Sequence, residues 1–392
     1  MPRRLADATG GGRAAKRPRR RRKHLYLVTE DWEQGYSIRK VDLEDDYDDN
    51  IHTCEKEKEE EQAGNSSRRH SERRLPPAVF RLEAPHEGAE HFTAAFGTKI
   101  MALHQTPRRY VPVFDVHTRC LSFGPRMRRN PSAPIYIPIQ DRLYGLDFDT
   151  FEMLDPPPPP VDPNCRSMDD VPKWQSWRRL PRPPFKRGRV TSHAVHPDGR
   201  TIFFSVDGKT GGTFSFDTMA SSPRWTRSGN WKLPFEGPAH YDRDLDAWVG
   251  LTATEDTEDE DMLGHLCSCD VPSTGDDDGR QPPAWKLSKE KLLCEEPEEK
   301  HIGAALVHLG TGCRSKLCLV QCLSLDDSEE GMYKEYLPER ERHLLRLMTF
   351  SPVYDKNGDL RTAAHRRVRS FELPKSMTEH YDFLQQPVAF WM

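Results

Sequence analysis

Four histidines, His91, His193, His240 and His301, stand at or near the start of short predicted strands in different parts of the chain. Neutral imidazole is a common ligand of zinc and copper, so strands that line one channel would let these side chains converge on a metal ion. No Asp, Glu or Cys stands at ligand spacing beside them, and the alternative is that these histidines hydrogen-bond to neighbouring repeat units at the channel wall. We expect no metal and no cofactor, and His193, His240 and His301 remain the candidates for a metal site.

Two pairs of cysteines, Cys267 with Cys269 and Cys318 with Cys322, each share one face of a predicted strand. Zinc sites built from cysteine pairs place a turn between the ligands, whereas these cysteines stand inside apolar runs. Free cysteine commonly packs as a small buried hydrophobe, so we interpret all four as core residues. Five tryptophans are interpreted as packing wedges between neighbouring sheets rather than ligand platforms: Trp177, Trp225, Trp231, Trp248 and Trp285.

The sequence contains none of the common catalytic signatures: no G-x-S-x-G elbow, P-loop, H-E-x-x-H motif or dinucleotide-binding fingerprint. The carboxylates Asp242 and Asp244 stand in a turn sequence, where Asp side chains bond to the backbone. We therefore expect a protein that is not an enzyme. The basic cluster at Arg178–Arg189 suits a phosphate-binding patch, and exposed charges on an outer strand are the alternative.

The elements that must position these residues are short strands separated by Gly or Asp turns, and no segment keeps a helical period. The apolar second strands of the repeating units start near Lys99, Arg142, Thr201, Ala247 and Lys316. Four strands per unit and a period of roughly 40 to 70 residues are typical of propeller blades. We predict an all-β fold, a β-propeller of six four-stranded blades, with five or seven blades as the alternatives.

The N-terminal unit has strands near 24–28, 36–43 and 78–84 but no first strand. An open ring would leave an unpaired strand edge, which proteins avoid. The chain ends in an apolar run, "VAFW", after a polar stretch. We predict that Val388, Ala389, Phe390 and Trp391 supply the missing strand by pairing with Leu25–Val28.

The domain organisation follows from the same pattern. Residues 1–23 are Gly, Ala and basic residues that cannot bury apolar surface, and we expect a disordered tail. Residues 24–392 are predicted to form one domain with charged or Pro-rich loop insertions. The insertions are expected at 44–77, 155–173, 253–261, 272–283 and 326–341.

Composition limits which partners and which cellular compartments are expected for this chain. The 392 residues carry a formal net charge of −4, so the chain as a whole is not suited to binding a polyanion. It has no run of eighteen apolar residues and no secretory signal, and its nine cysteines follow no disulfide spacing. We expect no membrane contact, reduced thiols, and a nuclear or cytoplasmic rather than a secreted protein.

The stretch "RVTSHAVHPDGRTIFFSV" resembles a kelch repeat. Together with "HYDRDLDAWVGL", "PAWKLSKEKL", "RSKLCLVQC" and "YDKNGDLRTAAHRRVRSFELP", it is similar to a family of uncharacterised plant proteins, expanded in grasses and regarded as kelch-like. The resemblance covers roughly residues 23–374. It implies a kelch-type propeller and brings no established activity.

These observations favour a protein-interaction scaffold whose propeller loops bind another protein, with the chain itself monomeric. Two alternatives stay open. One is a nuclear protein that binds nucleic acid through its basic arm, and the other is a metalloenzyme that uses the central channel.

The basic run in the N-terminal tail fits a nuclear-import signal or a nucleic-acid-contacting arm, and a merely solubilising tail is the alternative. The run comprises Lys16, Arg17, Arg19, Arg20, Arg21, Arg22 and Lys23. A fluorescent reporter fused to residues 1–30 should accumulate in the nucleus, and a control with these seven residues changed to Ser should not. A reporter that spreads evenly through the cytosol would contradict this prediction.

Overall fold

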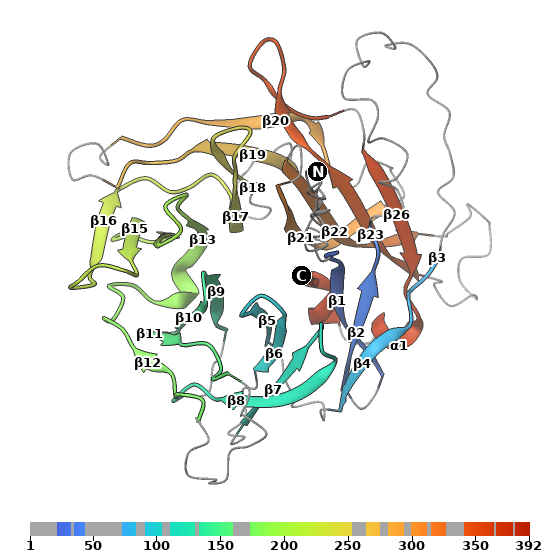
Figure 1. Ribbon diagram of the computed structural model, residues 1–392. Coiled ribbons are helices and arrows are strands. Elements are labelled where there is room, and N and C mark those ends of the chain that lie inside the picture. Colours follow the sequence, from blue (N-terminus) through green and yellow to red (C-terminus); the bar gives the residue numbers. More distant parts are fainter. Residues whose placement is uncertain are drawn as a thin grey trace, which may run out of the picture.

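The computed structural model is all-β (Figure 1), and two short helices, α1 (Lys375–Thr378) and α2 (Tyr381–Gln385), precede the last strand. The structure describes residues 22–32, 35–43, 73–83, 91–103, 110–129, 133–159, 173–252, 264–274, 281–293, 299–311, 315–326, 341–363, 366–378 and 381–392. No helix in these ranges is long and apolar enough to cross a membrane.

Most strands of the first half of the chain lie in three antiparallel sheets, the first of which also contains the last strand of the chain. Sheet I contains, in spatial order, β27 (Val388–Trp391), β1 (Leu25–Trp32), β2 (Gly35–Val41) and β4 (Ala78–Glu83). Sheet II contains β5 (His91–Ala95), β6 (Lys99–Leu103), β7 (Tyr110–Asp115) and β8 (Cys120–Pro125). Sheet III contains β9 (Ile135–Ile139), β10 (Arg142–Asp147), β11 (Thr150–Leu154) and β12 (Arg178–Arg179).

The second half follows the same plan. Sheet IV contains β13 (Val190–Val195), β14 (Thr201–Val206), β15 (Gly212–Asp217) and β16 (Trp225–Gly229). Sheet V contains β17 (Glu236–Asp242), β18 (Ala247–Leu251), β19 (His265–Asp270) and β20 (Trp285–Lys291). Sheet VI contains β21 (Glu299–Thr311), β22 (Ser315–Asp326), β23 (Glu341–Phe350), β26 (Arg367–Glu372) and β3 (Arg73–Arg74). A short 3₁₀ turn, η3 (Arg187–Arg189), leads into β13.

Two contacts extend this plan. The strands β13 and β17 pair in parallel, which joins sheets IV and V edge to edge. A hairpin of β24 (Pro352–Tyr354) and β25 (Leu360–Thr362) pairs with the outer edge of β20, so that these strands count as one ten-stranded sheet.

The sheets succeed one another around a ring, with β5, β9, β13 and β17 toward the centre and β8, β12, β16 and β20 at the periphery (Figure 1). A separate hydrophobic cluster fills each junction between neighbours. The junctions are I–II, II–III, III–IV, IV–V, V–VI and VI–I.

This arrangement explains why the second strands carry apolar residues at consecutive positions rather than at every second one. Successive side chains of a strand point to opposite faces, and here both faces are covered by a neighbouring sheet. In β14, Ile202 and Phe204 pack against sheet III, while Phe203 between them packs against sheet V. In β22, Leu319 faces sheet V, whereas Cys318 and its alternate neighbours face sheet I.

The two ends of the chain meet in sheet I. Strand β27 pairs antiparallel with β1, and Leu25 lies opposite Trp391 while Val28 lies opposite Val388. This is the pairing of Val388–Trp391 with Leu25–Val28 that the apolar C-terminal run predicts. Two backbone hydrogen bonds between His24 and Met392, of 2.7 and 3.0 Å, extend it.

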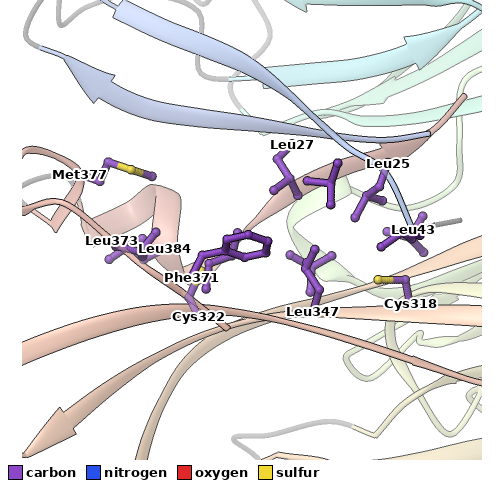
Figure 2. Packing of buried hydrophobic residues seen from close by; sticks show 14 of the residues in the cluster. Leu25, Leu27, Leu43, Cys318, Cys322, Leu347, Phe371, Leu373, Met377 and Leu384 are labelled. Carbon is purple, nitrogen blue, oxygen red and sulfur yellow. The ribbon is translucent and has the colours of Figure 1, made fainter. Parts of the chain in front are cut away.

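Side chains of β27 serve both junctions of sheet I. Val388 and Phe390 pack on the cluster shared with sheet II, and Ala389 and Trp391 pack on the cluster shared with sheet VI. Figure 2 shows the second cluster, in which Leu25 and Leu27 of β1 lie beside residues of β22, β23 and β26. The four residues of β27 therefore join the two ends of the ring in two ways, by backbone pairing with β1 and by side-chain packing on both neighbouring sheets.

The helices α1 and α2 carry the chain from sheet VI back to the centre. Met377 and Leu384 insert into the cluster between sheets VI and I. The backbone of α2 lies so close to β21 that a Cβ atom on Gly303 would overlap the carbonyl oxygen of Gln385. Only glycine fits at this position without moving backbone.

The structure corrects the predicted insertions in part. Residues 73 and 74 lie within the predicted insertion 44–77 but form β3, which pairs in parallel with β26. The β24–β25 hairpin was not predicted, because each of its strands is only three residues long. Most of the other insertions, and residues 1–21 of the predicted tail, lie outside the described residues.

Closure gives a stability prediction. Deleting residues 386–392 should lower the melting temperature markedly or make the protein insoluble, because β1 loses its partner and both junctions of sheet I lose apolar cover. A truncated chain that melts like the intact one would contradict this view of closure.

Gly303→Ala should destabilise the fold by about 1–3 kcal/mol through overpacking against α2. Gly188→Ala is the matched control, since a Cβ atom at Gly188 would meet no atom within 4 Å beyond its chain neighbours.

Candidate functional site

The four recurrent histidines all lie on strands that start a sheet: His91 on β5, His193 on β13, His240 on β17 and His301 on β21. They do not converge on one point. The ring of His240 instead stacks on His308 of β21, with centroids 6.1 Å apart and an interplanar angle of 18°.

Hydrogen bonds fix this histidine pair. His240 Nε2 lies 2.9 Å from the backbone oxygen of Leu306, and His308 Nε2 lies 3.1 Å from Ser315 Oγ. His193, on the neighbouring strand, stacks on Phe204 with a centroid distance of 6.0 Å. Of the four recurrent histidines, His240 bonds to the neighbouring sheet VI, whereas His193 packs on Phe204 of its own sheet.

The surroundings keep these imidazoles neutral. Burial, with smaller contributions from the positive charges of Arg187 and of a protonated His240, lowers the pKa of His193 to about 3. Burial likewise lowers the pKa of His240 to about 4, although its bond to Leu306 opposes the shift. The pKa of His308 is lowered by burial and by the charge of Lys23.

No metal site is formed by the candidates His193, His240 and His301. Within the described ranges, no group of three or more His, Cys, Asp or Glu side chains is placed to hold a metal ion. The pair His240 and His308 supplies two imidazoles, fewer than the three protein ligands of a typical catalytic zinc.

The bond between His308 and Ser315 does not make a catalytic triad. The carboxylate of Asp244 accepts a hydrogen bond from the Ser315 backbone N–H at 2.7 Å rather than orienting the imidazole. Ser315 is itself only 2% exposed, which leaves its hydroxyl no access to a substrate. Asp242 accepts the backbone N–H groups of Asp244 and Leu245, which is the turn role predicted for this pair.

The basic cluster at Arg178–Arg189 contributes to a cavity of about 160 Å³ in sheet III, together with Arg129. Its arginines are already paired. Arg182 and Arg129 contact Asp149, the latter at 3.7 Å, and Arg179 lies 3.6 Å from the buried carboxylate of Glu152. A phosphate group would have to displace these internal carboxylates.

The cysteine pairs are core residues, as predicted. Cys267 and Cys269 belong to the cluster between sheets IV and V, and Cys318 and Cys322 belong to that between sheets VI and I. Burial raises the pKa of Cys269, Cys318 and Cys322 to about 12, so their thiols stay protonated at neutral pH.

The tryptophans join neighbouring sheets, with one exception. Indole N–H groups donate across junctions from Trp177 to Pro125, from Trp248 to Val195 and from Trp225 to Pro181, at 2.9–3.0 Å. Trp231 is buried in the cluster between sheets IV and V. Trp285 is 47% exposed at the start of β20, so the packing interpretation was wrong for this residue.

The sequence reasoning missed an exposed apolar surface on sheet II. We call it the β8 patch, and it consists of Tyr110, Leu121 and Phe123, which are 63%, 45% and 59% exposed. Tyr110 and Phe123 touch edge to face at 6.4 Å between centroids. "CLSFG" was read as a fourth strand, and the absence of any charged residue in it was the available signal.

The comparisons with known proteins identify the family. The model of the family described as protein of unknown function (DUF1668) matches residues 22–370, so the chain belongs to this family. Among curated proteins no match is found.

Two solved structures are similar only at low identity. One is a structural genomics protein of unknown function from Bacteroides thetaiotaomicron VPI-5482, with 10% identity, a TM-score of 0.35 and coverage of 60% of this chain. The match spans 54% of that protein, about half of its length. The other is KlHsv2 with loop 6CD replaced by a Gly-Ser linker, with 9% identity, a TM-score of 0.40 and coverage of 90% of this chain and 100% of that one. Neither similarity is strong enough to bear on the function.

The neutral histidines give a pH prediction. Their folded pKa values lie below the unfolded value of about 6.5, so the unfolded chain binds more protons below that pH and the free energy of unfolding falls. Between pH 7 and pH 5 the wild-type protein should lose stability, and His193→Gln/His240→Gln should lose less over the same interval. The exposed His117→Gln serves as control, and urea unfolding at both pH values is the measurement. An unchanged slope in the double variant would show that these histidines do not titrate on unfolding.

Proposed function

We propose that the protein is a non-enzymatic interaction scaffold built on a six-bladed, kelch-like β-propeller. Sheets I to VI are the proposed blades. The support for a propeller is the cyclic order of six hydrophobic junctions, the last of which brings β1 against β22 and β26. Such a ring is rigid because the second strand of each sheet is buried on both faces.

The β8 patch carries the proposal of a scaffold. Large apolar side chains that gather on the surface of a soluble protein commonly mark an interaction site. Tyr110 and Phe123 lie in contact, and Leu121 shares the strand face of Phe123, since the two are two residues apart. The loops first expected to bind the partner lie mostly outside the described residues, so the patch, rather than the loops, becomes the proposed binding surface.

The groups that could do chemistry support a binding role over catalysis. The imidazoles of His193 and His240 are neutral and stacked, that of His240 is bonded to the backbone oxygen of Leu306, and the hydroxyl of Ser315 is enclosed. The arginines of the cavity in sheet III are paired with Asp149 and Glu152. Each of these groups contributes to the structure of the ring or its turns.

Substitution of the patch should abolish partner binding without changing the fold. A photo-crosslinking amino acid at position 123 of the full chain should capture a discrete protein from the source cells. The purified partner should then bind the wild-type chain with at least about tenfold higher affinity than it binds Leu121→Ser/Phe123→Ser. Met219→Ser is the matched control, because Met219 is 53% exposed in the turn that follows β15 of sheet IV.

A partner that binds the double variant as tightly as the wild-type chain would place the interaction elsewhere and contradict this proposal. Equal melting temperatures of the three proteins would show that any loss is one of contact rather than of folding.

A further inference from the structure

The outer edge of sheet II has no strand partner among the described residues, although at the end of β8 the carbonyl oxygen of Pro125 accepts a hydrogen bond from the indole of Trp177. Strand β8 is terminal in the order β5-β6-β7-β8, and no described strand pairs with its outer side. By contrast, β25 covers the outer edge of β20, and β3 covers that of β26. An uncovered edge presents backbone N–H and C=O groups to which another extended chain can bond.

The edge of β8 also lacks the usual protection against such pairing. Proteins commonly place charged side chains on free edges to prevent association. The fourth strands of sheets I, III and IV, which also lack an outer partner among the described strands, carry charges: Arg81 and Glu83 on β4, Arg178 and Arg179 on β12, and Arg227 on β16. The six residues of β8, "CLSFGP", carry none.

The chemistry of the two faces sets what an added strand would need. On one face, Leu121 and Phe123 are exposed beside Tyr110 and offer apolar contact to every second residue of a bound chain. The opposite face leaves less room for side chains, because the indole of Trp174 lies beside Gly124. A Cβ atom placed on Gly124 would lie 3.2 Å from Cζ3 of this indole. An occupant would therefore have apolar and small polar residues in alternation.

Positive charge frames both ends of the strand. Arg119 precedes β8, and Arg126 and Arg128 follow it; all three are exposed. None of them has an ion-pair partner among the described residues, whereas Arg129 lies 3.7 Å from Asp149. Unpaired arginines at both ends favour acidic residues that flank the apolar segment of a partner.

We propose that the outer edge of β8 binds an extended segment of another protein by strand addition, and that this segment alternates apolar and small residues between acidic flanks. The proposal rests on the function proposed above and specifies its binding mode. Backbone hydrogen bonds supply affinity in such complexes, and side-chain contacts supply specificity.

The test uses the full chain and synthetic peptides. The probe "EEVTVTVEE" should bind and slow hydrogen exchange of the backbone amides of residues 120–124. The basic probe "KKVTVTVKK" should bind at least about tenfold more weakly, and added salt should weaken the acidic probe. Phe123→Thr, which replaces the aromatic ring by a β-branched residue that strands also favour, should weaken binding of the acidic probe by a similar factor, and Met219→Thr should not.

N-methylation of the peptide separates strand addition from simple apolar contact. Alternate N–H groups of a strand point to opposite edges, so methylating the three Val residues and methylating the two Thr residues block different edges. One methylated peptide should lose binding, and the other should keep it within about threefold. Equal effects of the two, equal binding of the acidic and basic probes, or protection outside 120–124 would each overturn the proposal.

The experiment can refute strand addition without refuting the proposed scaffold function. A natural partner that depends on Leu121 and Phe123 but leaves exchange of the β8 amides unchanged would uphold the scaffold and refute strand addition.

Discussion

A ring of sheets depends on how its first and last sheets are joined. Here four C-terminal residues pair with β1, so that the two ends of the chain share sheet I. The same residues divide their side chains between the junctions with sheets II and VI. Because each sheet covers a face of its neighbours, loss of this join would expose apolar strands on both sides of sheet I.

Closure also determines what the residues near the centre can do. The strands that carry His193, His240 and His308 come close together only because sheets IV, V and VI follow one another around the ring. At that position burial and neighbouring positive charge keep the imidazoles neutral. The side chains best suited to chemistry are thus part of the junctions. The surface that remains open to a partner lies at the periphery, on β8.

Much of this fold could be predicted, because a second strand buried on both faces must be apolar throughout, as in "TIFFSV" and "KLCLVQC". The closing strand was predictable because "VAFW" leaves four apolar residues that need cover. Strand β3 was not, since two arginines carry no periodic signal and pair with β26 across about 300 residues of chain. The β8 patch escaped notice because the apolar pattern of a strand does not tell which face lacks a neighbour, and Trp285 was misread for the same reason.

The most direct test of closure is a methyl NOE measurement on the intact chain with Leu, Val and Ala methyl groups labelled. Directly opposed residues of an antiparallel pair have Cβ atoms about 4.5–5.5 Å apart, within reach of such contacts. The register predicts NOEs between Val28 and Val388 and between Leu27 and Ala389. Their absence, or a pattern displaced by one residue so that Leu27 contacts Val388 instead, would contradict the closed ring.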